Sequence, residues 1–142
     1  MAELVSVSEL MTKQVKTVRP DTSVREVVAT MNRLGIGSVV VVQGDRPVGI
    51  ITERDVLSRV VEACIPPETR RAREIMTSPI VAIDQNASVK EATQIMVHRK
   101  IKKLIVVDQG KLVGIITHTD IISKMPNMMS TLEALLRPQK TY

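Results

Sequence analysis

The chain has 142 residues, 44% hydrophobic and 25% charged, so it can form a packed core, while its single cysteine, Cys64, excludes an internal disulfide and a cysteine-based zinc site. No apolar run approaches the ~18 residues of a membrane-spanning helix, and the N-terminus does not read as a secretory signal, so we expect a cytoplasmic protein. The formal net charge of +5 favours an anionic partner, such as a nucleotide, a nucleic acid or an acidic protein.

The first predicted elements are a short strand and a helix. Residues 15–18 form an extended segment that ends just before Pro20, because proline disfavours helix in the residue that precedes it. Ser23 and Glu26 have the spacing of a capping box, which predicts a helix from residue 24, and Gly35 is a suitable stop. The apolar stripe of this helix consists of Val24, Val27, Val28, Met31 and Leu34.

A β-hairpin and a second helix follow. Residues 38–42 are a β-branched apolar run typical of a buried strand, and residues 48–52 form the next strand. The turn at Gly44 and Asp45 is short, so the two strands are antiparallel. Residues 55–61 are predicted to be helical.

The same order of elements recurs, because the sequence repeats itself without a gap after about 65 residues. Glu-Leu-Met-Thr at 9–12 becomes Glu-Ile-Met-Thr at 74–77, and Val-Gly-Ile-Ile-Thr at 48–52 recurs at 113–117. The second copy predicts an extended segment at 81–83, a helix capped by Ser88 and Glu91, strands at 104–107 and 112–117, and a helix beginning near Ile121.

The chain therefore divides into a first repeat at 5–62, a linker at 63–73, a second repeat at 74–126 and a C-terminal helix and tail at 127–142. The last helix has an apolar stripe, which packs on the protein's own core or forms a face for a partner or a second copy. Its members are Met128, Met129, Leu132, Leu135 and Leu136.

Each repeat, with about 50 residues, is too small to bury a sheet and two helices by itself. We therefore predict an α/β fold of the α+β type, in which two β-α-β-β-α repeats pack together with pseudo-twofold symmetry.

The repeated blocks resemble the CBS domain, which is named after cystathionine β-synthase and usually occurs in tandem pairs. The resemblance rests on residues 9–12, 20–26 and 48–55 and on their counterparts at 74–77, 87–92 and 113–120. It covers residues 5–126, so the chain is similar to a stand-alone CBS pair. The resemblance implies a regulatory module, not an enzyme, that binds AMP, ADP, ATP or S-adenosylmethionine in clefts between the repeats. It also implies a homodimer that passes ligand occupancy to a partner protein.

In both copies, the segment Gly-Ile-Ile-Thr-x-x-Asp crosses from a strand into a helix start, where free amides favour a carboxylate. Asp55 and Asp120 can therefore cap their helices or accept the two hydroxyls of a ribose. The resemblance favours ribose binding, with capping as a compatible second role.

Phosphate contacts are expected to differ between the copies. Thr52 and Thr117 are placed to reach a phosphate or ribose oxygen, or else to bond the local backbone. Arg54 suits a phosphate, whereas its counterpart Thr119 is uncharged, and His118 is a candidate replacement for that charge.

The resemblance adds Lys102 and Lys103 as phosphate ligands; a solvated basic strand end is the alternative. Their counterparts in the first repeat, Gly37 and Ser38, are small and neutral. The base is expected to lie among Thr17, Val18, Ile36, Gly37 and Val39, or among Ala82, Ile83, Ile101 and Leu104.

Two other functions remain open. Arg70, Arg71 and Arg73 form one basic cluster and residues 98–103 another, which fits a nucleic-acid-associated protein or a solvated basic face. Tyr142 is the one aromatic residue apart from the histidines, which argues against base stacking. A dimerisation module without a ligand is the other alternative. No nucleophile–base constellation supports catalysis.

Overall fold

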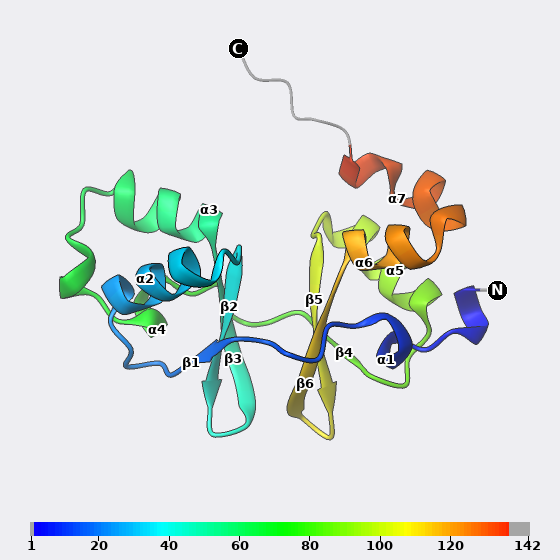
Figure 1. Cartoon of the computed structure of the whole chain (residues 1–142), viewed down its shortest axis with the longest axis horizontal. Helices are drawn as coiled ribbons and strands as arrows, with labels where there is room; N and C mark the ends of the chain where they lie inside the picture. The colour runs from blue at the N-terminus through cyan, green and yellow to red at the C-terminus, as the bar shows by residue number, and fades with distance from the viewer. Residues whose placement is uncertain (1, 137–142) are drawn as a thin grey trace, which may run out of the picture. The chain divides into compact units, whose positions relative to one another are not determined.

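A computed structural model describes residues 2–136 of the chain, and its contacts divide them into two compact units (Figure 1). One unit is Val15–Ile80. The other joins the residues before Val15 to those from Val81 onward. Each unit contains a three-stranded sheet, and the mixed α+β class predicted from the sequence is confirmed. Residues 137–142, the end of the predicted tail, lie outside the described residues.

The unit Val15–Ile80 has the predicted order of strand, helix, strand, strand and helix. Its sheet runs β1-β2-β3, with β1 parallel and β3 antiparallel to β2. The second helix begins at Glu53, earlier than predicted, because Thr52 caps it. The elements are β1 (Thr17–Val18), α2 (Val24–Leu34), β2 (Ser38–Gln43), β3 (Arg46–Thr52), α3 (Glu53–Val56), the π-helical segment η2 (Leu57–Val61), the 3-10 turn η3 (Pro67–Thr69) and α4 (Ala72–Ile75).

The other unit repeats this architecture, with sheet order β4-β5-β6 and the same strand directions. Its second helix begins at His118, three residues before Ile121, again after a threonine cap. The elements are the 3-10 turn η1 (Ala2–Leu4), α1 (Val7–Leu10), β4 (Ala82–Asp84), α5 (Val89–Arg99), β5 (Lys103–Asp108), β6 (Lys111–Thr117), α6 (His118–Lys124), the 3-10 turn η4 (Pro126–Met128) and α7 (Met129–Leu136).

The two long helices are capped as predicted at their starts. The Ser23 hydroxyl accepts from the Glu26 amide at 3.1 Å, and Ser88 accepts from Glu91 at 3.0 Å. The ends differ between the copies: Gly35 ends α2 with a φ of 64°, whereas Lys100 ends α5 with a φ of 56°. Glycine adopts this left-handed conformation freely, but a residue with a side chain is strained there.

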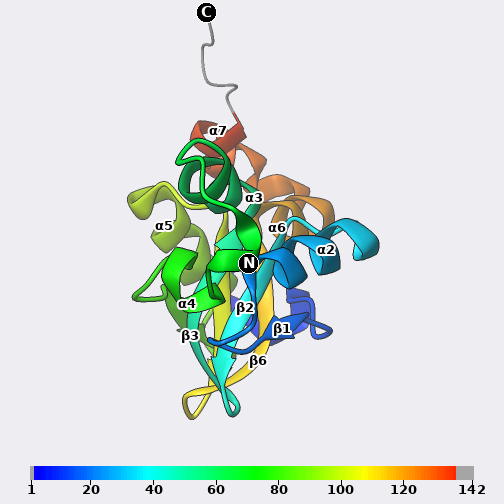
Figure 2. The same cartoon turned by 90° about the vertical axis from the view of Figure 1, so that its left-hand side faces the viewer.

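The compact units do not coincide with the repeats along the chain, because each repeat sends its first helix to the other unit. Helix α4, from the second repeat, lies beside the start of α2, with residue 23 bridged to residue 71 (Figures 1 and 2). Helix α1, from the first repeat, belongs to the unit of α5 and α6. Part of the predicted linker, from residue 67, is thus an ordered piece of the unit Val15–Ile80. How the two units pack together stays a prediction.

Two close backbone approaches hold these exchanged segments. Thr77 and Ile50 exchange backbone hydrogen bonds of 2.8 and 3.2 Å, and Thr12 and Ile115 exchange bonds of 2.8 and 3.0 Å. Gly49 and Gly114 lie at the contacts, where an added Cβ would overlap the methionine of the repeated Glu-x-Met-Thr block. This explains why Val-Gly-Ile-Ile-Thr and Glu-x-Met-Thr occur as a pair of motifs.

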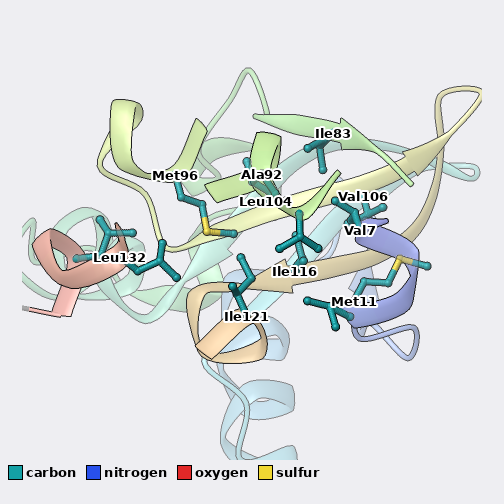
Figure 3. Packing of buried hydrophobic residues seen from close by; sticks show 13 residues of the cluster. Val7, Met11, Ile83, Ala92, Met96, Leu104, Val106, Ile116, Ile121 and Leu132 are labelled. Carbon is teal, nitrogen blue, oxygen red and sulfur yellow. The ribbon is translucent and has the colours of Figure 1, made fainter. Parts of the chain in front are cut away.

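Each unit has its own hydrophobic core. In Figure 3, Val7 and Met11 from the exchanged segment pack with Met96 of α5, Leu104 of β5 and Ile121 of α6. The C-terminal helix joins this core through Leu132 and Leu135, while Met129 and Leu136 stay exposed. Of the two interpretations of its apolar stripe, packing on the protein's own core therefore accounts for the central residues.

Candidate functional site

Asp55 lies at the junction of β3 and α3, and its carboxylate is largely buried. Its Oδ2 accepts from the Thr52 amide at 2.9 Å and from the Thr52 hydroxyl at 3.1 Å, and the Thr52 hydroxyl accepts from the Asp55 amide at 3.3 Å. The capping role expected for this residue is thus present. A carboxylate has about four acceptor positions, so capping leaves capacity for further donors.

The remaining oxygen of Asp55 contacts residues that the sequence analysis did not select. Asp55 Oδ1 accepts from the Thr77 hydroxyl at 2.9 Å and lies 3.9 Å from Arg59 Nη1. Arg59 also donates to the carbonyls of Ile75 and Met76, at 3.0 and 2.8 Å. The recurrence of Thr77 in the Glu-x-Met-Thr block was the available signal, but only the fold brings it to Asp55.

In the other unit, Asp120 has fewer donors. It accepts from the Thr117 amide at 2.9 Å, and the Thr117 hydroxyl accepts from the Asp120 amide at 3.1 Å. Lys124, the counterpart of Arg59, donates to the Leu10 carbonyl at 3.2 Å. Thr12 is the counterpart of Thr77, but within residues 2–136 its hydroxyl forms no hydrogen bond with Asp120. The Asp120 residue is half-buried. The Asp120 carboxylate is therefore the more available of the two.

The start of each central strand lies beside its helix junction. Ser38 pairs with Thr52, and the Glu53 amide donates to the Gly37 carbonyl at 3.1 Å. In the other unit Lys103 pairs with Thr117. There the His118 amide donates to the Lys102 carbonyl at 3.0 Å. Within each unit, the fold therefore brings the predicted strand-start and strand-end residues together.

The surroundings of His118 disfavour its charged form. Burial, together with the positive charges of Lys102 and Lys103, lowers the pKa of His118 below its ordinary value of 6.5. Its ring is therefore neutral at neutral pH. Its Nδ1 is buried and has no hydrogen-bond partner among the described residues.

The residues expected around the base fall into two groups. Val18, Val39, Ile83 and Leu104 belong to the cores of their units, so they can offer a ligand only main-chain atoms. The remaining ones are less buried: Thr17, Ile36, Gly37 and Ile101 are half-buried and Ala82 is exposed.

Strands β1 and β4, which carry residues 17–18 and 82–83, are sheet edges whose outer main-chain groups have no strand partner in their own sheet. A hollow of about 470 Å³ is lined by Ile36 and Gly37 together with residues of α2, α3 and η2.

The side chains assigned to phosphate are exposed or half-buried. Arg54 is exposed and forms no hydrogen bond or ion pair with any described residue, and Thr119 is exposed. Lys102 is exposed and Lys103 half-buried. Among residues 2–136, no group of three or more histidine, cysteine or acidic side chains is placed to hold a metal ion. No helix in that range is long and apolar enough to span a membrane.

The comparisons with known proteins identify the family. The CBS domain model matches residues 7–62 and 72–127. These two matches cover most of the chain, so the protein belongs to the CBS-domain family and carries two CBS domains.

Relatives and solved structures agree with this assignment. An uncharacterized protein of Methanopyrus kandleri is 41% identical over 131 residues, 91% of this chain and 67% of that protein. CBS domain-containing protein YhcV of Bacillus subtilis is 32% identical and is matched over 86% of this chain and 87% of its own length. The inosine-5'-monophosphate dehydrogenase of Methanocaldococcus jannaschii is 35% identical over 82% of this chain, which spans 23% of that enzyme.

Among solved structures, an uncharacterized conserved protein of Pyrococcus horikoshii matches with a TM-score of 0.77 at 30% identity over the whole of both chains. The CBS domain protein PAE2072 of Pyrobaculum aerophilum, complexed with AMP, has a TM-score of 0.79 at 24% identity, with 91% of this chain and 99% of that chain covered.

Proposed function

We propose that this protein is a non-enzymatic regulatory module that binds AMP, ADP or ATP and signals occupancy to a partner protein. The observation that carries the proposal is the strand-to-helix junction that occurs in both units. At each junction an aspartate keeps acceptor positions that capping does not use, and the sheet of the same unit has a short edge strand. The AMP complex of PAE2072, which has the same fold, supports the ligand class.

The roles follow from the chemistry of each group. In each site the aspartate, Asp120 in one and Asp55 in the other, accepts both hydroxyls of a ribose, because hydroxyl donors match a carboxylate. Thr117 and Thr52 add a hydroxyl beside them. Main-chain groups of the short edge strands bind the adenine, since residues 2–136 contain no Phe, Trp or Tyr to stack on it.

The two sites have unequal strength. Lys102 and Lys103 give the junction at Asp120 two cations for a phosphate, whereas the junction at Asp55 has Arg54. Asp55 must also release the Thr77 hydroxyl before it accepts a second ribose hydroxyl. The tighter site is therefore the one that contains Asp120.

Calorimetric titration with AMP, ADP, ATP and S-adenosylmethionine tests this assignment. Asp120→Asn should weaken the tighter site about tenfold to a hundredfold, the effect of losing charge-assisted hydrogen bonds. Asp55→Asn should affect only the weaker site, and Glu133→Gln on the exposed surface of α7 is the control. The absence of saturable binding by all four compounds to folded protein would reject the ligand class.

The homodimer is proposed from an apolar surface of the unit Val15–Ile80. Leu57 and Val61 are each 61% exposed and Leu34 is 48% exposed. Leu57 also lines the 470 Å³ hollow. Leu57 and Val61 are one helical turn apart; exposed apolar side chains so grouped mark interaction sites, and a second copy of this face is the partner we propose. Leu57→Glu should shift the mass measured by light scattering from dimer to monomer, whereas Leu4→Glu, at an exposed leucine of the other unit, should not.

A further inference from the structure

A second groove in the unit Val15–Ile80, of about 620 Å³, lies along β1 and α2 and is rich in cations. Lys16 and Arg19 flank β1, Arg33 lies in the last turn of α2, and Arg71 precedes α4. A groove of this size is in the range of small-molecule sites. None of these four side chains belongs to the proposed nucleotide site, although Thr17 and Val18 border the groove through β1.

The groove has an excess of positive charge. Two carboxylates, Asp21 and Glu26, also line it, so four cations face two anions. Arg19 lies 3.6 Å from Asp21, and Arg71 donates to the Asp21 carbonyl at 3.2 Å. Across the described part of the chain, Lys16 and Arg33 have no hydrogen-bond or ion-pair partner for their side chains. Two cations are therefore available to an anion.

A hydroxyl in the same groove also forms no hydrogen bond with a described residue. Thr30 on α2 lines the groove and is only 7% exposed, and its hydroxyl forms no hydrogen bond with a described residue. The other buried threonine of the long helices, Thr93, donates to the Val89 carbonyl at 2.9 Å, which is the usual bond for a helical threonine. The Thr30 hydroxyl oxygen is not fully buried, so it can exchange a hydrogen bond with a ligand or with water in the groove.

The fold does not require any of these side chains. Lys16, Arg19, Arg33 and Arg71 correspond in the other unit to Val81, Asp84, His98 and Ser6, and Thr30 corresponds to Ile95. The other unit folds in the same way without a lysine or arginine at any of these positions. The cations and the hydroxyl are thus a property of the unit Val15–Ile80 and are not shared by the other unit.

We propose that this groove binds a small organic phosphate through side chains that the nucleotide site does not use. A phosphate monoester carries between one and two negative charges at neutral pH, which match the excess of positive charge in the groove. Arg33 and Lys16 bind the phosphate oxygens, and Thr30 provides a hydroxyl hydrogen bond. A CBS module with this groove responds to two ligands: a nucleotide and a phosphorylated metabolite.

Titration of isotope-labelled full-length protein with inorganic phosphate, followed by amide chemical shifts, tests the proposal. The expected result is a saturable shift of amides in residues 16–33. Arg33→Gln and Thr30→Val should each weaken the affinity about tenfold, since each removes one hydrogen-bonding group. Arg25→Gln, which removes an exposed arginine of the same helix outside the groove, should leave the affinity unchanged.

Three results would overturn the proposal. The first is amide shifts that do not saturate with phosphate. The second is an equal loss of phosphate affinity in Arg25→Gln and Arg33→Gln. The third is that the shifts disappear in a Lys102→Gln/Lys103→Gln double variant but persist in Arg33→Gln. The last result would assign the phosphate to the nucleotide site. Thr30→Val should stay folded because the second repeat has isoleucine at that place. Failure of AMP to bind leaves this experiment unaffected.

Discussion

At the scale of single residues, the two copies use different side chains for the same structural task. Gly35 and Lys100 both end a long helix in the left-handed region. Arg59 and Lys124 both bond a carbonyl of an exchanged helix, Ile75 in one unit and Leu10 in the other. Such pairs offer matched tests, because the backbone is the same and the side chain differs.

Lys100→Gly should raise the free energy of unfolding. A left-handed lysine costs about 1–2 kcal/mol, and the greater freedom of glycine in the unfolded chain offsets part of this. A net gain of about 0.5–1 kcal/mol is expected in urea unfolding. Gly35→Lys, the reverse change at the equivalent position, should lower stability. A loss of stability in Lys100→Gly would contradict the strain assigned to that helix end.

His118 should make stability depend on pH. Because its pKa in the folded protein lies below 6.5, the unfolded chain takes up the proton first as the pH falls. The stabilising contribution is therefore complete above pH 6.5 and is lost as the pH falls from there through the folded pKa. Urea unfolding at about pH 7.5 and about pH 5.5 should show a larger loss in wild type than in His118→Asn. Equal losses in both would show that His118 does not couple to folding.

At the scale of elements, the exchanged helices explain two motifs that appear unrelated in the sequence. The methionine of Glu-x-Met-Thr fits over a glycine of the neighbouring strand, as Met76 does over Gly49. In the other unit, the strand glycine Gly114 approaches both Met11 and the Thr12 carbonyl, which is already bonded to Ile115. The contact at Gly49 is with a flexible side chain only, whereas the contact at Gly114 also includes a backbone oxygen.

Gly49→Ala and Gly114→Ala should both destabilise the protein, by about 1–3 kcal/mol, as expected for overpacking. Met76→Ala should relieve part of the Gly49→Ala effect, because an added Cβ at Gly49 meets the Met76 side chain. Met11→Ala should relieve a smaller part of the destabilisation by Gly114→Ala, because a Cβ at residue 114 would still lie 2.8 Å from the Thr12 carbonyl oxygen. Double-mutant cycles of unfolding free energy measure this difference. Purely additive effects at Gly49 and Met76 would contradict the contact.

At the scale of the whole molecule, exchange of α1 and α4 makes each repeat depend on the other half of the chain. Residues 15–62 lack α4, which brings the Thr77 bonds to Ile50 and Asp55. Residues 81–126 lack α1 and the bonds of Thr12 to Ile115. The covalent halves are therefore not the folding units.

Fragments of residues 1–65 and 66–142 should consequently be poorly folded when separate and should regain structure when mixed. Each fragment contains a helix that completes the sheet unit of the other. Circular dichroism should show a cooperative thermal transition for the mixture and only a weak one for either fragment. Fragments that each unfold cooperatively, with no change on mixing, would rule out the exchange.

The local structure of this protein follows from its sequence. The Ser-x-x-Glu spacing, the apolar helix stripes and the β-branched runs predicted the long helices and hairpins, because caps and periodicity act over a few residues. The 65-residue repeat predicted two equal units and paired junction aspartates.

The tertiary structure decided the rest. It moved α1 and α4 into the opposite units, brought Thr77 and Arg59 to Asp55, and left Asp120 with fewer donors. It also placed Thr30 in one groove with four cations that are far apart in the sequence. Such contacts join residues separated by tens of positions, and no local pattern selects among the many ways a chain can bring them together.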